Sequence, residues 1–123
     1  MIETGKTYTQ DMTVTSKDTA VVYGSGKLEV FATPALVALM ENTAVCCLEG
    51  SLEPGTDTVG IEINTQHIKA TGVGQKVSCK ATVTCVDGRR IRFEIEAWDE
   101  KGPVGHATHD RFIIQPEKFM SKL

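Results

Sequence analysis

The segment from Val30 to Gly50, VFATPALVALMENTAVCCLEG, constrains the fold of this chain more than any other. It predicts one long helix, with Thr33 as the N-cap, Pro34 at the first helical position and Gly50 just past the end. Apolar residues surround almost its whole circumference, whereas a surface helix has one apolar stripe. We therefore expect the helix to be enclosed on most sides, which makes Glu41, the one carboxylate between Pro34 and Leu48, unusual.

Short strands are expected around this helix. Period-two alternation of apolar and polar residues predicts strands at Val59–Ile68, Lys76–Val86, Arg89–Asp99 and Val104–Ile114, and weaker patterns predict two more at Tyr8–Val14 and Ala20–Tyr23. Each of the later strands has one apolar and one polar face, which is typical of an antiparallel sheet. The sequence thus predicts an α+β fold in which a curved antiparallel sheet wraps one long buried helix, as a single domain over residues 1–123.

The turn around Asp87 sets the register of the central hairpin. A two-residue turn at Asp87 and Gly88 would mix the apolar and polar faces of the two strands. A three-residue loop of residues 86–88, with Gly88 left-handed, instead pairs Val83 with Ile91 and keeps Cys85 on the apolar face. We predict the second register.

Composition excludes several classes of protein. The net charge is -3 with 13 basic and 16 acidic residues, which leaves no basic surface for a nucleic acid. No stretch of 18 apolar residues predicts a membrane span, and residues 1–10 lack the pattern of a signal peptide, so a cytoplasmic protein is expected. The four cysteines have no C-x-x-C spacing and are predicted to be reduced, buried thiols, without a metal site. The final Ser121-Lys122-Leu123 is either a peroxisomal address or a chance ending.

Glu41 and Thr33 are the first candidates for chemistry. A buried carboxylate without partners is unfavourable, so Glu41 either forms an ordinary ion pair or faces a half-buried cleft, where it could act as a general base or orient water. Thr33 either only caps the helix or also touches a substrate carbonyl next to the free N–H groups of the helix start.

Two later strands carry further candidates. His67 is in phase with Ile61 and Ile63 and is expected to face the helix. It is either a structural residue or a neutral imidazole that hydrogen-bonds a substrate or shares a proton with Glu41. Arg111 shares its strand face with His109 and Ile113, and it is either a solvated or ion-paired residue or a group that binds a carbonyl or an anion. His106 and His109 lie on opposite faces of their strand, so structural or surface roles are expected for them.

Several of these motifs together resemble one family. Val30-Phe31-Ala32-Thr33, the helix with Glu41, the His67 strand, the Asp87-Gly88-Arg89-Arg90 turn and Thr108-His109-Asp110-Arg111 follow one another as in the hotdog-fold acyl-CoA thioesterases of the fluoroacetyl-CoA thioesterase type. The resemblance implies hydrolysis of a small acyl-CoA at the interface of a homodimer or higher oligomer. It also implies catalytic roles for Thr33, Glu41 and His67 and substrate binding by Gly60 and Arg111, with CoA as part of the substrate and no other cofactor.

The sequence departs from this family at two places. The segment from Tyr23 to Leu28 has no counterpart of the aromatic lid, and Pro34 replaces the residue that follows the threonine. Thr33 and Glu41 are eight residues apart, about 12 Å along a helix axis. A second subunit is therefore expected to complete the site. The nucleophile, whether Thr33, Glu41 or water, stays open, and so do two rival functions, a non-catalytic acyl-CoA or small-ligand binding protein and a hydratase.

Overall fold

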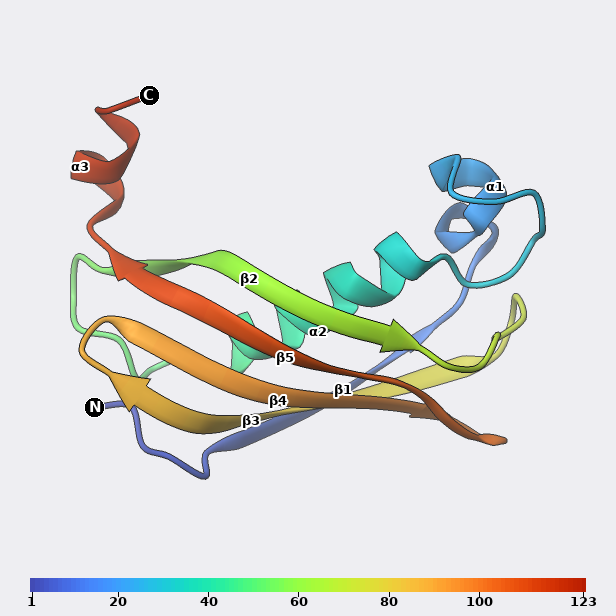
Figure 1. Cartoon of the computed structure of the whole chain (residues 1–123), viewed down its shortest axis with the longest axis horizontal. Helices are drawn as coiled ribbons and strands as arrows, with labels where there is room; N and C mark the ends of the chain where they lie inside the picture. Colours follow the sequence, from blue (N-terminus) through green and yellow to red (C-terminus); the bar gives the residue numbers. More distant parts are fainter.

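The computed structural model describes residues 1–123 as one five-stranded sheet crossed by one long helix (Figure 1). The elements are β1 (Thr7–Thr13), the 3-10 turn η1 (Ser16–Asp18), α1 (Ala20–Tyr23), α2 (Thr33–Cys47), β2 (Asp57–His67), β3 (Lys76–Asp87), β4 (Arg90–Asp99), β5 (Gly102–Ile114) and α3 (Pro116–Met120). All neighbouring strands are antiparallel, in the order β1-β3-β4-β5-β2. The predicted α+β fold, a curved antiparallel sheet around a helix, is confirmed.

The core lies between α2 and the concave face of the sheet. The helix contributes the buried residues Ala35, Leu36, Leu39, Met40, Thr43, Ala44 and Cys47. The central strands contribute Val77, Cys79, Ala81, Val83, Ile91, Phe93, Ile95 and Ala97, as their alternation predicts. No helix of the protein is long and apolar enough to cross a membrane.

One side of α2 stays uncovered in the single chain. Thr33, Pro34, Ala38 and Asn42 are exposed, and Glu41 is partly exposed. The prediction that the helix is enclosed on most sides is therefore wrong for one chain, because five strands cover only the side of α2 that faces them. Helices α1 and α3 rise beyond the β2 edge at opposite ends of the molecule (Figure 1).

The start of α2 differs from the prediction by one residue. Ala32, not Thr33, occupies the extended N-cap position, and its carbonyl accepts the first helical hydrogen bond from Leu36. No side chain caps this helix. The hydroxyl of Thr33 is instead engaged by His67, so it is not available to the backbone. At the other end the helix stops at Cys47, and Gly50 follows with a positive φ of 78°.

The segment Ala20–Tyr23 is a short helix rather than the predicted strand. Four residues are too few for periodicity to separate the two states. The N–H of Gly24, at φ 69°, bonds to the carbonyls of Ala20 and Val21 and closes the helical turn. Just before it, Thr15 and Asp18 form a reciprocal capping box at η1.

The central hairpin has neither register considered from the sequence. Asp87 pairs with Arg90, and Gly88 at φ 61° turns the chain, so the left-handed glycine is confirmed but the three-residue loop is wrong. A bulge between Val83 and Cys85 then shifts the pairing, so that Val83 lies opposite Phe93. The extra residue keeps the apolar faces together up to Val83 and leaves Cys85 exposed, contrary to the prediction.

A second bulge interrupts β2 between Gly60 and Glu62. It shifts the alternation of the side chains along the strand, so Ile61 is exposed. The prediction that Ile61 shares a face with His67 is therefore wrong. His67 itself does face the helix, as predicted, since its ring contacts Thr33. The bulge therefore separates the start of β2, with Gly60, from the end that carries His67.

Replacement of Gly105 by alanine should destabilise the sheet. A Cβ at this position on β5 would lie 2.6 Å from the backbone oxygen of Gln66 and 3.0 Å from Cδ2 of Leu36. Because backbone on one side and core on the other cannot move freely, we expect a loss of about 1–3 kcal/mol in the free energy of unfolding, measured in urea. Gly72→Ala is the control, since its Cβ would meet only Gln75, at 3.5 Å. Equal stability of the two variants would contradict this packing.

Candidate active site

Thr33 and His67 form a polar pair at the start of α2. The Oγ1 atom of Thr33 is 2.8 Å from Nδ1 of His67, the last residue of β2, and the two share a hydrogen bond. The ring of Phe31 packs edge-on against the imidazole, with centroids 6.3 Å apart. The Nε2 atom of His67 is buried without a hydrogen-bond partner. Burial lowers the pKa of His67, so the imidazole is neutral at pH 7 and one of its nitrogens is unused.

A pocket of about 310 Å³ opens beside this pair. Its walls come from the start of α1, the loop before α2 and the residues after β2: Ala20, Ser25, Val30, Phe31, Ala32, Thr33, His67, Ile68, Lys69 and Ala70. Lys69 is tied down by an ion pair with the buried carboxylate of Asp99, which also accepts a bond from Thr71. The segment after His67 is therefore anchored to the end of β4.

Glu41, Gly60, His109 and Arg111 form a second group, the Gly60 cluster. A Cβ added to Gly60 would lie 2.7 Å from Oε2 of Glu41, 3.2 Å from Nη1 of Arg111 and 3.2 Å from Cε1 of His109. The missing side chain is what lets three polar groups from α2 and β5 approach β2 at one point. A glycine is required here by close approach rather than by backbone conformation, since its φ is not positive.

Arg111 is the buried charge of this cluster. Its guanidinium donates from Nε to Oγ1 of Thr58 at 2.9 Å and from Nη2 to the carbonyl of Thr58 at 3.1 Å. The Nη1 atom is 3.8 Å from Oε2 of Glu41, whose side chain is 40% exposed. Burial lowers the pKa of Arg111 while Glu41 opposes this shift, and the guanidinium remains charged. Glu41 therefore does have a partner, and it still reaches solvent.

Two further residues contact Arg111, and neither was a candidate for chemistry from the sequence. His109 was expected on the same strand face as Arg111, with a structural or surface role, and its buried ring does lie 3.3 Å from Arg111. Thr58 holds Arg111 through both its hydroxyl and its carbonyl, and nothing in the sequence around it indicates this contact.

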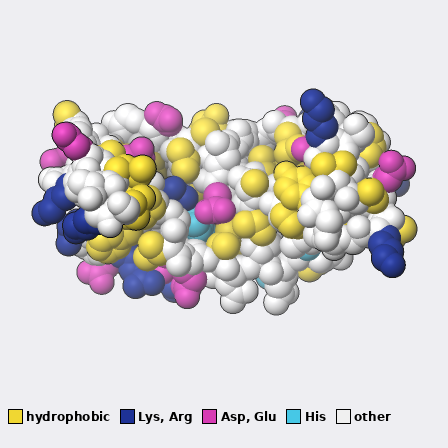
Figure 2. Space-filling model, turned by 90° about the horizontal axis from the view of Figure 1, so that it is seen from above, with side chains coloured by type: hydrophobic (Ala, Val, Ile, Leu, Met, Phe, Trp, Pro, Cys, Tyr) yellow, Lys and Arg dark blue, Asp and Glu magenta, His cyan; other side chains and the backbone are white.

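The structure therefore assembles the predicted site residues into two separate groups. Thr33 meets His67, and Glu41 meets Gly60 and Arg111, but no contact joins the two groups within the chain. Figure 2 shows the molecule of Figure 1 from above. Near the middle of this face, acidic, basic and histidine side chains lie close together among hydrophobic ones.

Other parts of the molecule offer less for chemistry. A larger hollow, about 530 Å³, lies on the outer face of the sheet and contains none of the predicted site residues; it is lined mostly by polar side chains of β2 to β5. No group of three or more His, Cys, Asp or Glu residues is placed to hold a metal ion. The four cysteines are unpaired.

The fold is that of the hotdog thioesterases. A solved hot-dog-like protein from Thermanaerovibrio acidaminovorans superposes with a TM-score of 0.91 at 24% identity, covering 98% of this chain and 90% of the other. The fluoroacetyl-CoA thioesterase FlK superposes with a TM-score of 0.93 at 34% identity, covering 99% of this chain and 95% of that one.

Sequence comparison identifies the family within this class. Residues 14–117 match the fluoroacetyl-CoA-specific thioesterase family. The chain is also similar to the fluoroacetyl-CoA thioesterase of Streptantibioticus cattleyicolor, with 39% identity over 95 residues, which are 77% of this chain and 68% of that protein. The chain belongs to the fluoroacetyl-CoA-specific thioesterase family.

The titration of His67 provides a direct check of the first polar pair. Because burial lowers its pKa, the ring should titrate below pH 6.5 in a two-dimensional NMR experiment. The unfolded chain binds the proton more readily, so this residue should reduce stability as pH falls below 6.5 and have no such effect above it. The denatured protein serves as the reference. Titration of His67 at or above pH 6.5 in the folded protein would contradict the burial described here.

Proposed function

We propose that the protein hydrolyses a small acyl-CoA thioester to the free acid and CoA, with Thr33, Glu41 and His67 as its catalytic residues. The observation that carries the proposal is the Thr33–His67 pair, in which a neutral imidazole shares a hydrogen bond with a hydroxyl and keeps a buried, unpartnered Nε2. Such a pair is suited to moving a proton to or from a reacting group. Membership of the family supports the same reaction class.

In the proposed reaction, the thioester carbonyl lies near the start of α2. Either the hydroxyl of Thr33 or a water molecule attacks the carbonyl carbon, and His67 accepts the proton that the nucleophile loses. The carbon–sulfur bond breaks, and the thiolate of CoA takes up a proton. If Thr33 is the nucleophile, water then hydrolyses the acyl–threonine ester, so both routes end in one carboxylic acid and one thiol. In the water route Glu41 orients the attacking water while His67 takes its proton, and in the Thr33 route Glu41 takes a proton from the water that hydrolyses the ester.

Gly60 and Arg111 are proposed to bind the acyl group. Without a side chain at Gly60, Glu41 and Arg111 approach β2 so closely that an added Cβ would lie 2.7 Å from the carboxylate and 3.2 Å from the guanidinium. The N–H groups of a guanidinium can bind a carbonyl or another electronegative atom.

A homodimer would complete the site. β2 is an edge strand with free backbone groups, and the neighbouring side of α2 is uncovered in the single chain. Antiparallel pairing of two β2 strands about a two-fold axis at Asn64 sets Gly60 opposite the partner's His67, once the extra residue of the bulge is counted. Opposite residues in an antiparallel pair project to the same face. The Gly60 cluster would then face the Thr33–His67 pair of the other subunit, which offsets the separation of about 12 Å along α2.

A cytoplasmic location fits this proposal. All four cysteines are unpaired thiols, as in proteins of reducing compartments. Thioesters of CoA are intracellular metabolites, so the substrate and the proposed enzyme would share a compartment.

Glu41→Gln should keep the fold and lower kcat by about 10²- to 10⁴-fold, because an amide cannot act as a base. Thiol release from a panel of short, branched, aromatic and long acyl-CoAs measures the effect. Glu49→Gln is the matched control, an exposed glutamate past the end of the same helix. Near-normal turnover of Glu41→Gln would refute the assignment, and tight acyl-CoA binding by the wild type without thiol release would indicate a binding protein instead.

Mixing of two inactive variants should restore activity if the site spans two subunits. Thr33→Ala and Glu41→Gln each disable one half, so a mixed dimer contains one site with both defects and one intact site. Random assortment makes half of the dimers mixed, and we expect about a quarter of wild-type activity after co-refolding. Each variant refolded alone is the control. No recovery in a mixture that light scattering identifies as dimeric would exclude a shared site.

A further inference from the structure

Arg111 contacts three polar residues, Thr58, Glu41 and His109. Thr58 accepts hydrogen bonds from Nε and Nη2, which fixes the plane of the guanidinium. The remaining nitrogen, Nη1, is 3.3 Å from Nε2 of His109 and 3.8 Å from Oε2 of Glu41. A Cβ on Gly60 would lie 3.2 Å from this same Nη1, so His109 contacts the part of Arg111 that faces the proposed acyl site.

The protonation of His109 follows from its contacts. Its Nδ1 is 2.7 Å from the carbonyl oxygen of Glu62, and a carbonyl only accepts, so Nδ1 carries the proton. A neutral ring then has a bare Nε2 that can accept a hydrogen bond from Nη1 of Arg111. Phe93 stacks on the ring with centroids 6.1 Å apart, and only 1% of His109 is exposed. The ring therefore has one orientation and one tautomer.

The surroundings of His109 also keep the ring neutral. Burial lowers its pKa and the charge of Arg111 lowers it further, while the bond to Glu62 and the charges of Glu41 and Asp110 act in the opposite direction. These groups come from α2, β2 and β5, and the stacked ring from β4 is uncharged. A second proton on the ring, at Nε2, would remove the hydrogen-bond acceptor of Arg111 and put a positive charge beside the guanidinium.

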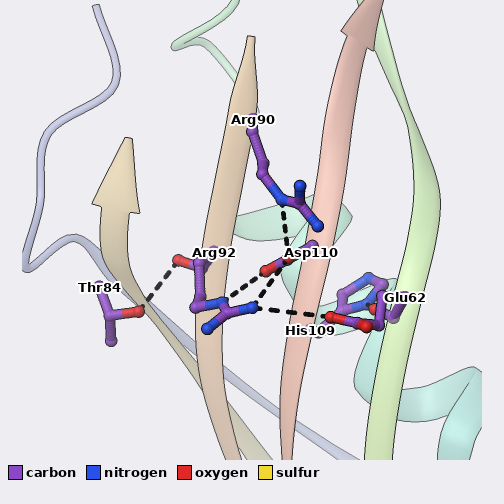
Figure 3. A network of polar contacts seen from close by, with 6 residues as sticks. All are labelled: Glu62, Thr84, Arg90, Arg92, His109 and Asp110. Atoms are coloured by element: carbon purple, nitrogen blue, oxygen red, sulfur yellow. Dashed lines mark hydrogen bonds and ion pairs between the residues drawn. The ribbon is translucent and has the colours of Figure 1, made fainter. Parts of the chain in front are cut away.

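A network on the outer face supports the acceptor of this histidine (Figure 3). Glu62 follows the β2 bulge, and its carboxylate is 3.6 Å from Arg92. Arg92 and Arg90 both donate to Asp110, which is buried and lies between His109 and Arg111 in β5. The hydrogen bond from Arg92 holds the pKa of Asp110 below its usual range. The bulge is thus tied to β4 and β5 beside His109.

We propose that His109 is a positioning residue that orients the Nη1 atom of Arg111 toward Glu41 and Gly60, through its neutral, Nδ1-protonated imidazole. The expected effect on kcat/KM rests on the proposed thioesterase function. The protonation of Nδ1 rests on the geometry alone. No atom of His109 needs to touch the substrate. The ring connects the β2 bulge and the guanidinium, because Nδ1 donates to the Glu62 carbonyl at the bulge and Nε2 accepts from the guanidinium.

Two substitutions separate positioning from packing. His109→Gln keeps an acceptor oxygen near the place of Nε2, whereas His109→Leu fills similar space without one. We expect kcat/KM for a short acyl-CoA to stay within a few-fold of wild type in the glutamine variant and to fall about 10²-fold in the leucine variant. The leucine variant leaves the Glu62 carbonyl and Nη1 of Arg111 without this partner, so its thermal midpoint should be lower, and kcat/KM is compared at a temperature at which both variants are folded. Equal kcat/KM in the two variants, whether high or low, would overturn the proposal.

Nitrogen-15 NMR of the resting wild-type protein tests the tautomer without turnover. At pH 7 the Nδ1 of His109 should be protonated and Nε2 bare, whereas a free imidazole favours a proton on Nε2. A protonated Nε2 would overturn the proposal even if both variants fail to fold. Absence of thiol release by the wild type would instead refute the thioesterase assignment, and the NMR result would still decide the geometry.

Discussion

The contact between Arg111 and Glu41 is the interaction on which the rest of the site depends. A guanidinium that is only 7% exposed needs hydrogen-bond acceptors, and a carboxylate nearby adds a favourable opposite charge. Thr58 and His109 provide the hydrogen bonds, and Glu41 provides the charge from α2. The same contact joins the helix to the β2 and β5 edge of the sheet, so the carboxylate that interrupts an apolar helix is explained by a charge on the neighbouring strand.

The absence of a side chain at Gly60 makes this contact sterically possible. Since Oε2 of Glu41 comes within 2.7 Å of where a Cβ would lie, any larger residue would displace the carboxylate. The bulge that follows Gly60 has a second effect, because it directs the carbonyl of Glu62 to His109. One irregularity of β2 therefore shapes both the space at the site and the orientation of the groups around it.

Sequence analysis predicted the features that follow from a local pattern and missed those that depend on long-range arrangement. The helix, the alternation of β3 and β4 and the inward face of His67 were predicted, because each follows from a period of 3.6 or 2 within one segment. The bulges near Gly60 and Thr84 were not, since one extra residue leaves the local composition unchanged. The helical turn of residues 20–23 was missed for a similar reason: Gly24 closes it, and four apolar residues fit either state.

The sequence by itself determined the fold class, the long helix with its single carboxylate, and the candidates Thr33, Glu41, His67, Gly60 and Arg111. Only the tertiary structure decided how they group, with Thr33 on His67 and Glu41 on Arg111, because these partners are 34 and 70 positions apart and meet only when β2 and β5 pack against α2. It also decided that His109 and Thr58 belong with Arg111. Contacts of that kind depend on strand order and register, which a local pattern does not encode.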